Sequence, residues 1–85
     1  MIKLSATYRM SKSNTPAVAS ALITRASAFV SVIEIELEGT RIVLGSLIGV
    51  LALKLKYDAT VNIIATGHDE EDAALSIKEM IEQPM

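Results

Sequence analysis

The chain lacks cysteine and tryptophan and has a single histidine, His68, among its 85 residues. Without cysteine it forms no disulfide and has no thiolate nucleophile, a composition that suits a reducing compartment. Zinc sites are built mainly from Cys and His ligands, and one histidine with scattered acids does not supply such a set. We therefore expect neither a metal site nor a cofactor.

Basic charge and long apolar runs are also scarce. Eight Lys and Arg stand against ten Asp and Glu, a net charge of −2, whereas duplex binding needs a basic surface. The longest uncharged stretches, 13–24 and 42–53, fall well short of the about 20 residues of a spanning helix. The first residues form no apolar signal core. We expect a cytoplasmic protein that binds neither nucleic acid nor membrane.

Apolar residues, by contrast, are plentiful. The hydrophobic fraction is 51% and the charged fraction 21%, which is too apolar for a disordered chain and enough for one modest core. The length predicts a single domain over residues 1–85. The mean hydropathy of +0.41 is high for a soluble domain and indicates an exposed apolar patch that could dock a partner.

Hydrophobic periodicity predicts the elements of the first half. Alternating apolar residues over 2–8 indicate a strand with one buried face, and the polar stretch 10–15 indicates a loop. Thr15 is a favourable helix cap and Pro16 fits the first helical position, so a helix is predicted over about 16–27.

The second half is predicted in the same way. Glutamates alternate with apolar residues over 33–38, a Glu-Gly turn follows, and a strand returns over 40–44. Ser46 is a plausible cap for a short helix over 47–53. A strand is predicted over 60–66, buried through Val61, Ile63 and Ala65. The acids at 69–72 then begin a last helix that Pro84 ends.

The resulting order, β-α-β-β-α-β-α, is that of an α+β domain. Three helices are expected to cover one face of a four-stranded, mostly antiparallel sheet. The ferredoxin-like split βαβ pattern is nearly the same string, and periodicity does not separate the two.

Four segments carry a resemblance to a known family. They are Ala-Ser-Ala-Phe at 26–29, Leu-Glu-Gly-Thr at 37–40, Ser-Leu-Ile-Gly-Val-Leu-Ala-Leu at 46–53 and Gly-His-Asp-Glu at 67–70. The chain resembles HPr, the small phosphocarrier of the bacterial sugar phosphotransferase system. The resemblance implies an open-faced β-sandwich with an antiparallel sheet.

The family's carrier site departs from its pattern here. Its motif is Gly-x-His-Ala-Arg-Pro, whereas this chain has Lys-Ser-Asn-Thr-Pro-Ala at 12–17. Without gaps, Thr15 takes the histidine position. Aligning Pro16 to the family proline puts Ser13 there instead, but needs a two-residue insertion later. A hydroxyl without an adjacent base is a weak nucleophile and its phosphate ester a poor donor. We therefore expect a non-catalytic protein that has lost carrier activity.

The remaining motif residues have both structural and functional interpretations. Thr15 is interpreted as a helix cap and His68 as an exposed loop residue. Ser46 matches the serine that an ATP-dependent kinase phosphorylates in many family members. The alternative is that Ser46 has no role beyond capping its helix. The family's catabolite-repression branch also keeps this serine and lacks the carrier histidine. Gly45 replaces the lysine that usually precedes it.

The resemblance also implies an apolar docking patch, and core packing is the alternative. The residues concerned are Leu47, Ile48 and Leu51, together with Ala17 and Ser20 on the first helix.

Three functions remain open from the sequence. The first is a regulatory or docking protein switched by phosphorylation of Ser46. The second is a phosphotransfer component with an unconventional acceptor, Thr15 or Ser13. The third is an unmodified interaction module. The partners expected are proteins, with HPr kinase, a transcriptional regulator and other phosphotransferase components as candidates, and the chain is expected to be a monomer or a weak homodimer.

Overall fold

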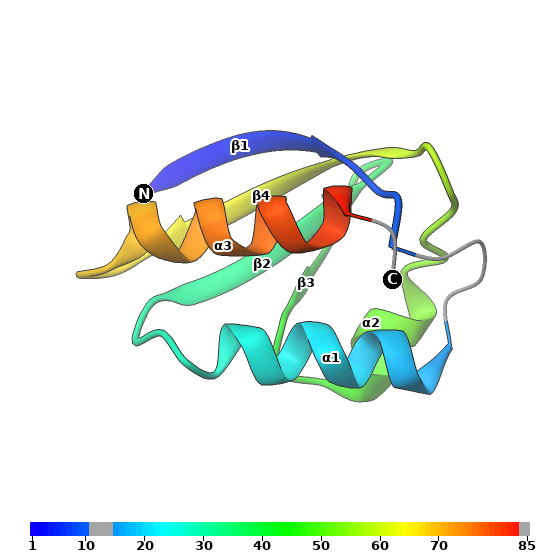
Figure 1. The fold of residues 1–85 in the computed structure, drawn as a ribbon, viewed down its shortest axis with the longest axis horizontal. Coiled ribbons are helices and arrows are strands. Elements are labelled where there is room, and N and C mark those ends of the chain that lie inside the picture. Colours follow the sequence, from blue (N-terminus) through cyan, green and yellow to red (C-terminus); the bar gives the residue numbers. More distant parts are fainter. Residues whose placement is uncertain (11–14, 84–85) are drawn as a thin grey trace.

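The computed structural model describes residues 1–10 and 15–83, and Figure 1 shows the order of its elements. The strands are β1 (Ile2–Thr7), β2 (Val32–Leu37), β3 (Thr40–Val43) and β4 (Thr60–Thr66). The helices are α1 (Pro16–Ala26), α2 (Leu47–Ala52) and α3 (Glu70–Glu82). Every element predicted from periodicity and capping is present.

The strands form one sheet in the order β1-β4-β2-β3. β4 pairs with β1 on one side and with β2 on the other, and β3 extends the sheet beyond β2. All three pairings are antiparallel. The ferredoxin-like sheet is also antiparallel but has β3 between β1 and β2, whereas β4 lies there in this sheet. The strand order therefore separates the two folds and confirms the open antiparallel sheet.

The core lies between the sheet and the helices. In β4, Val61, Ile63 and Ala65 are buried as predicted, and they share one cluster with buried residues of every helix. That cluster contains the apolar stripes of the two longer helices, which are Val18, Ala19, Leu22 and Ala26 of α1 and Ala73, Ala74, Ile77 and Ile81 of α3. The helices therefore cover one face of the sheet, and the opposite face carries mostly polar side chains.

Two residues are more buried than their patterns predict. Ile64 points to the face away from the helices and is nevertheless buried, because the register places Lys3 and Glu34 on either side of it. The aliphatic stems of such residues cover apolar surface. Met10, predicted in a loop, is buried within the core cluster. Core residues thus continue beyond the end of β1.

Several elements end one residue earlier than predicted, among them β1 at Thr7, α1 at Ala26 and β2 at Leu37. α2 ends at Ala52 rather than Leu53, because Lys54 adopts a left-handed conformation with φ of 50°. β3 ends at Val43 rather than Leu44, where the Gly45 N–H donates to the Val43 carbonyl and turns the chain. The predicted stop at Pro84 lies outside the described residues.

Candidate functional site

The start of α1 is where the sequence resemblance places the family's carrier motif. Thr15 is the helix cap, and its Oγ1 accepts a hydrogen bond from the Val18 N–H at 3.4 Å. Pro16 is the first helical residue, as predicted. The Thr15 hydroxyl oxygen is thus engaged by the backbone of its own helix. Ser13, the second choice for the carrier position, lies outside the described residues.

Ser46 begins α2 with the same kind of cap. Its Oγ accepts a hydrogen bond from the Gly49 N–H at 3.2 Å, and its side chain is exposed. A Cβ on Gly49 would make only ordinary van der Waals contacts, at 3.5 Å from the Cβ and Oγ of the serine. A hydroxyl that accepts a cap bond keeps its own proton and stays accessible for modification.

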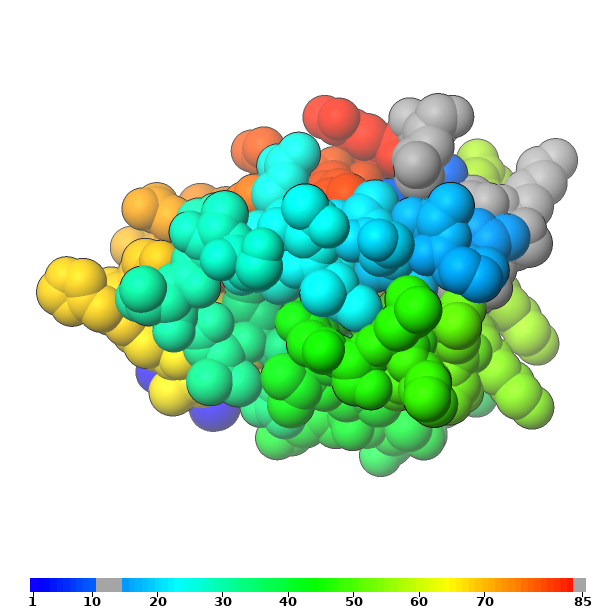
Figure 2. Space-filling model, turned by 90° about the horizontal axis from the view of Figure 1, so that it is seen from below, coloured from blue at the N-terminus to red at the C-terminus, as the bar shows by residue number. Residues whose placement is uncertain are grey.

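α1 and α2 pack beside each other, and Figure 2 shows them adjacent on one face of the molecule. Ile48 is 81% exposed and Leu47 42%. Leu51 is partly buried against the core, and Ala17 and Ser20 on α1 are exposed. We call the surface that these residues share the α1–α2 face. Core packing accounts for Val50 and Leu53, and not for Leu47 or Ile48.

The α1–α2 face is electrically neutral. Residues 15–24 and 42–53 include no ionisable side chain. Among the described residues, the only hydrogen bonds of the Thr15 and Ser46 hydroxyls are those that they accept from backbone N–H groups. Neither hydroxyl therefore donates to a base that could activate it as a nucleophile.

His68 is exposed in the loop before α3, as predicted. Figure 1 shows that α3 begins at the opposite end of the molecule from the start of α1. The histidine cannot replace a carrier group at α1 from that position.

Asp69, next to this histidine, has a role that the sequence did not indicate. It makes no side-chain cap bond to α3. Its carboxylate instead accepts hydrogen bonds from the Val30 N–H at 3.0 Å, the Ser31 N–H at 2.9 Å and the Ser31 hydroxyl. The Ser31 hydroxyl bond in particular holds the pKa of Asp69 below its usual value. The one sequence feature that could have indicated this contact is a single serine, Ser31, between two valines.

Glu36 belongs to a polar network that joins β2 to the other three strands. It accepts a hydrogen bond from the Asn62 amide at 3.2 Å and pairs with Lys3 at 3.6 Å and Arg41 at 3.5 Å. The Asn62 bond, followed by the two cations, lowers the pKa of Glu36. Glu38 belongs to the hairpin turn rather than to the strand. This polar network lies on the sheet face away from the helices.

Other classes of site lack support within residues 1–10 and 15–83. No group of three His, Cys, Asp or Glu side chains lies close enough to hold a metal ion in this part of the chain. Among the helices described, none has the length and apolar character needed to cross a membrane.

Comparison with known proteins gives a consistent result. The family described as "PTS HPr component phosphorylation site" matches residues 16–83. The histidine-containing phosphocarrier protein of a Mycoplasma is 31% identical, covers 93% of this chain and 90% of its own, and superimposes with a TM-score of 0.79.

Two further structures share the fold at lower identity. HPr from Thermoanaerobacter tengcongensis has a TM-score of 0.88 at 24% identity, with 96% of this chain and 92% of that one covered. The catabolite-repression protein Crh of Bacillus subtilis, described as an intertwined, domain-swapped dimer, has a TM-score of 0.66 at 23% identity, with 98% and 95% covered.

Proposed function

This chain belongs to the HPr family of the bacterial sugar phosphotransferase system, and we propose that it acts there as a regulatory docking protein rather than as a phosphate carrier. The observation that carries the proposal is the exposure of Leu47 and Ile48 beside the exposed, capped Ser46 on a face without charges. Family members are phosphocarriers that act on other proteins of the system, so a protein partner in the cytoplasm is the expected ligand.

The chemistry at the start of α1 argues against carriage. A carrier group must accept a phosphoryl group and release it again, as an imidazole nitrogen does near neutral pH. Thr15 offers a hydroxyl oxygen that already accepts the Val18 N–H, and no ionisable side chain follows it within α1 before Arg25. The hydroxyl therefore has no group in this segment to activate it.

Ser46 is suited to act as a switch. Phosphorylation adds about −1.5 to −2 charges at neutral pH. Placed at the start of α2, the new charge would be tolerated by the helix dipole and would convert a neutral face into an anionic one. A partner that reads the apolar residues Leu47 and Ile48 would then distinguish the two states by charge.

The first experiment is the intact mass after incubation with HPr kinase and ATP. A mass gain of one phosphoryl group that is absent in Ser46→Ala supports the switch. The control is ordinary HPr, which should be modified in a parallel tube. Incubation with Enzyme I and phosphoenolpyruvate is the second arm. A phosphoryl group gained there and lost in Thr15→Val would identify a carrier and contradict the proposal.

Docking is tested separately, with purified HPr kinase and Enzyme I as the two probe proteins. Leu47→Glu and Ile48→Glu should weaken binding by at least roughly tenfold, because each places a charge in an apolar contact. Leu75→Glu is the matched control, since Leu75 lies on α3 and is 47% exposed, close to the 42% of Leu47. Equal loss in all three variants would contradict docking through the α1–α2 face.

A further inference from the structure

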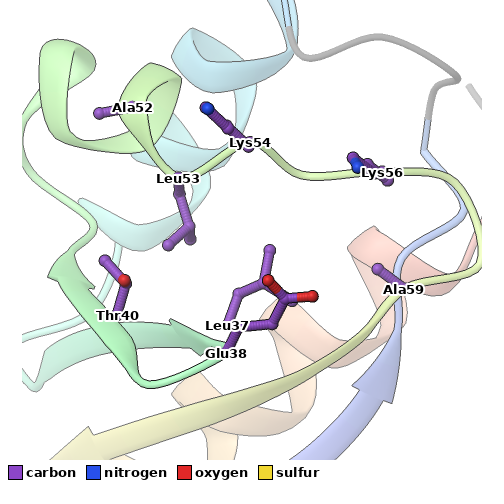
Figure 3. Close-up of a pocket in the computed structure, with 8 residues that line it drawn as sticks. All are labelled: Leu37, Glu38, Thr40, Ala52, Leu53, Lys54, Lys56 and Ala59. Atoms are coloured by element: carbon purple, nitrogen blue, oxygen red, sulfur yellow. The ribbon is translucent and has the colours of Figure 1, made fainter.

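A hollow of about 310 Å³ lies between the hairpin turn, the end of α2 and the chain that leads into β4. Figure 3 shows its lining, with Leu37 and Leu53 facing each other across it. Its apolar residues are Leu37, Ala52, Leu53 and Ala59, and its polar residues are Glu38, Thr40, Lys54 and Lys56. The volume is at the lower end of the range for cavities that bind small molecules.

The polar side chains of this hollow have no hydrogen-bond or salt-bridge partners among residues 1–10 and 15–83. Within the described part of the chain, the salt bridges use Lys3, Arg9, Arg41 and Lys78, but neither of the two lysines of the hollow. Glu38 and Thr40 likewise make no side-chain hydrogen bond among those residues. Two cations, one anion and one hydroxyl are therefore free to bind a ligand in a space with an apolar floor.

The backbone supplies a second, independent observation. Three described residues other than glycine have a positive φ: Glu38 and Lys54, both at 50°, line the hollow, and Asp58, at 70°, does not. Glycine or asparagine is favoured at such positions, in a tight hairpin turn and directly after a helix, and other residues are strained there by roughly 1 kcal/mol. The turn and the helix end would form more easily with glycine. Charged side chains stand at both positions, and both line the hollow.

From this arrangement we propose that the hollow binds a small phosphate monoester that carries hydroxyl groups. Lys54 and Lys56 lie two residues apart on the segment between α2 and β4 (Figure 3), and a pair of ammonium groups suits a phosphate dianion better than a single carboxylate. An ionised carboxylate only accepts hydrogen bonds, so Glu38 requires a donor such as a hydroxyl, and Thr40 can donate or accept. The carbon chain between phosphate and hydroxyls contacts Leu37 and Leu53. This site is separate from the α1–α2 face and does not depend on the proposed function.

The test is a titration of the ¹⁵N-labelled protein with sn-glycerol 3-phosphate, followed by backbone amide shifts. Saturable shifts are expected for residues 37–40, 52–56 and 59. Lys54→Gln combined with Lys56→Gln should weaken binding by roughly tenfold or more, because both cations are lost. Lys3→Gln is the control, since Lys3 lies on the far side of the sheet in the Glu36 network. All substituted residues are exposed, so the variants should keep the native spectrum.

Separate titrations with inorganic phosphate and with glycerol define the ligand class. Glu38→Gln should weaken binding of glycerol 3-phosphate and not that of inorganic phosphate, because only the former has carbon-bound hydroxyls that reach Glu38 while the phosphate is held by the lysines. Inorganic phosphate binding as tightly as glycerol 3-phosphate would overturn the proposal, since it would show attraction of any anion. The absence of saturable shifts, or a double lysine variant that binds like the wild type, would overturn it as well.

Discussion

Small hydroxyl side chains act in two regions of this molecule, and they act differently. On the α1–α2 face, Thr15 and Ser46 each bond a backbone N–H three residues ahead. At the start of α3, the Ser31 hydroxyl bonds Asp69, which is 38 positions away in the chain. The first kind of contact caps the start of a helix and leaves the helix surface exposed. The second kind joins segments that are distant in the sequence. A local cap therefore leaves the neighbouring surface accessible to partners, whereas a long-range hydrogen bond holds two segments together and buries the residues between them.

The packing of the two regions follows the same division. Ser31 is only 8% exposed, and the carboxylate of Asp69 also takes the N–H groups of Val30 and Ser31. Around Ser46, by contrast, Leu47 and Ile48 are exposed. We refer to Val30, Ser31, Gly67 and Asp69 as the Ser31–Asp69 junction. The comparison predicts that substitutions in this junction affect stability, whereas substitutions on the α1–α2 face affect binding.

The largest effect is expected from a glycine in the junction. A Cβ on Gly67 would lie 2.6 Å from the Ser31 Oγ and 2.7 Å from its Cα, and the φ of 153° is unfavourable for alanine. Gly67→Ala should therefore lower the free energy of unfolding by about 3 kcal/mol or more. Urea denaturation followed by circular dichroism measures the change.

Gly49→Ala is the control from the other region. Its Cβ would meet only ordinary contacts, and alanine favours the helix, so a gain of up to about 1 kcal/mol is expected. Equal losses at both glycines would remove the proposed difference between the regions.

The next largest effect is expected from Ser31→Ala. This change removes a buried hydroxyl that donates to a charged carboxylate, and such bonds contribute about 1.5–3 kcal/mol. The urea midpoint should fall, while binding of HPr kinase stays at the wild-type level because the α1–α2 face is untouched. A midpoint within error of the wild type would show that the junction does not stabilise the fold.

A pH dependence follows from the same junction. The pKa of Asp69 is lowered in the folded protein, so the stabilisation is present above the pKa of the unfolded chain, near 4. It is lost as the pH falls through that value toward the folded pKa. Asp69→Asn should be less stable than the wild type at pH 7, and the difference in the free energy of unfolding between the two proteins should be smaller at pH 3. A gap that is constant with pH would mean that the charge of Asp69 is not what stabilises the junction.

The smallest effect is expected at Ser46. Ser46→Ala loses a cap on a short, exposed helix, for about 1 kcal/mol, and Ser46→Asp should keep the cap and stay near the wild type. Thermal unfolding compares the three proteins. A loss at Ser46→Ala that exceeds the loss at Ser31→Ala would reverse the comparison between the regions.

The secondary structure could be predicted because its causes are local. Alternation over 2–8 and 60–66 marks a buried strand face, and Thr15 with Pro16 marks a helix start, since each pattern depends on neighbours within a few residues. The Glu-Gly pair predicted the hairpin turn for the same reason. Ile64 was missed because its burial depends on Lys3 and Glu34, which other strands bring beside it.

The candidate site divides in the same way. The sequence placed Ser46 at a helix start, and the resemblance implied that Leu47 and Ile48 are exposed. The alternative of core packing was decided only by the way α2 packs on α1 and β3. The hollow was missed entirely, because Glu38 and Lys54 belong to different elements and meet only in three dimensions.

By itself the sequence determined the elements, their caps and the family, because these depend on residue order over short distances. The tertiary structure alone decided which of the acids at 69–72 would bond Ser31 and which glutamate of β2 would join a polar network. Those outcomes depend on which distant residues the sheet order β1-β4-β2-β3 brings together. A local sequence pattern does not contain information about such long-range contacts.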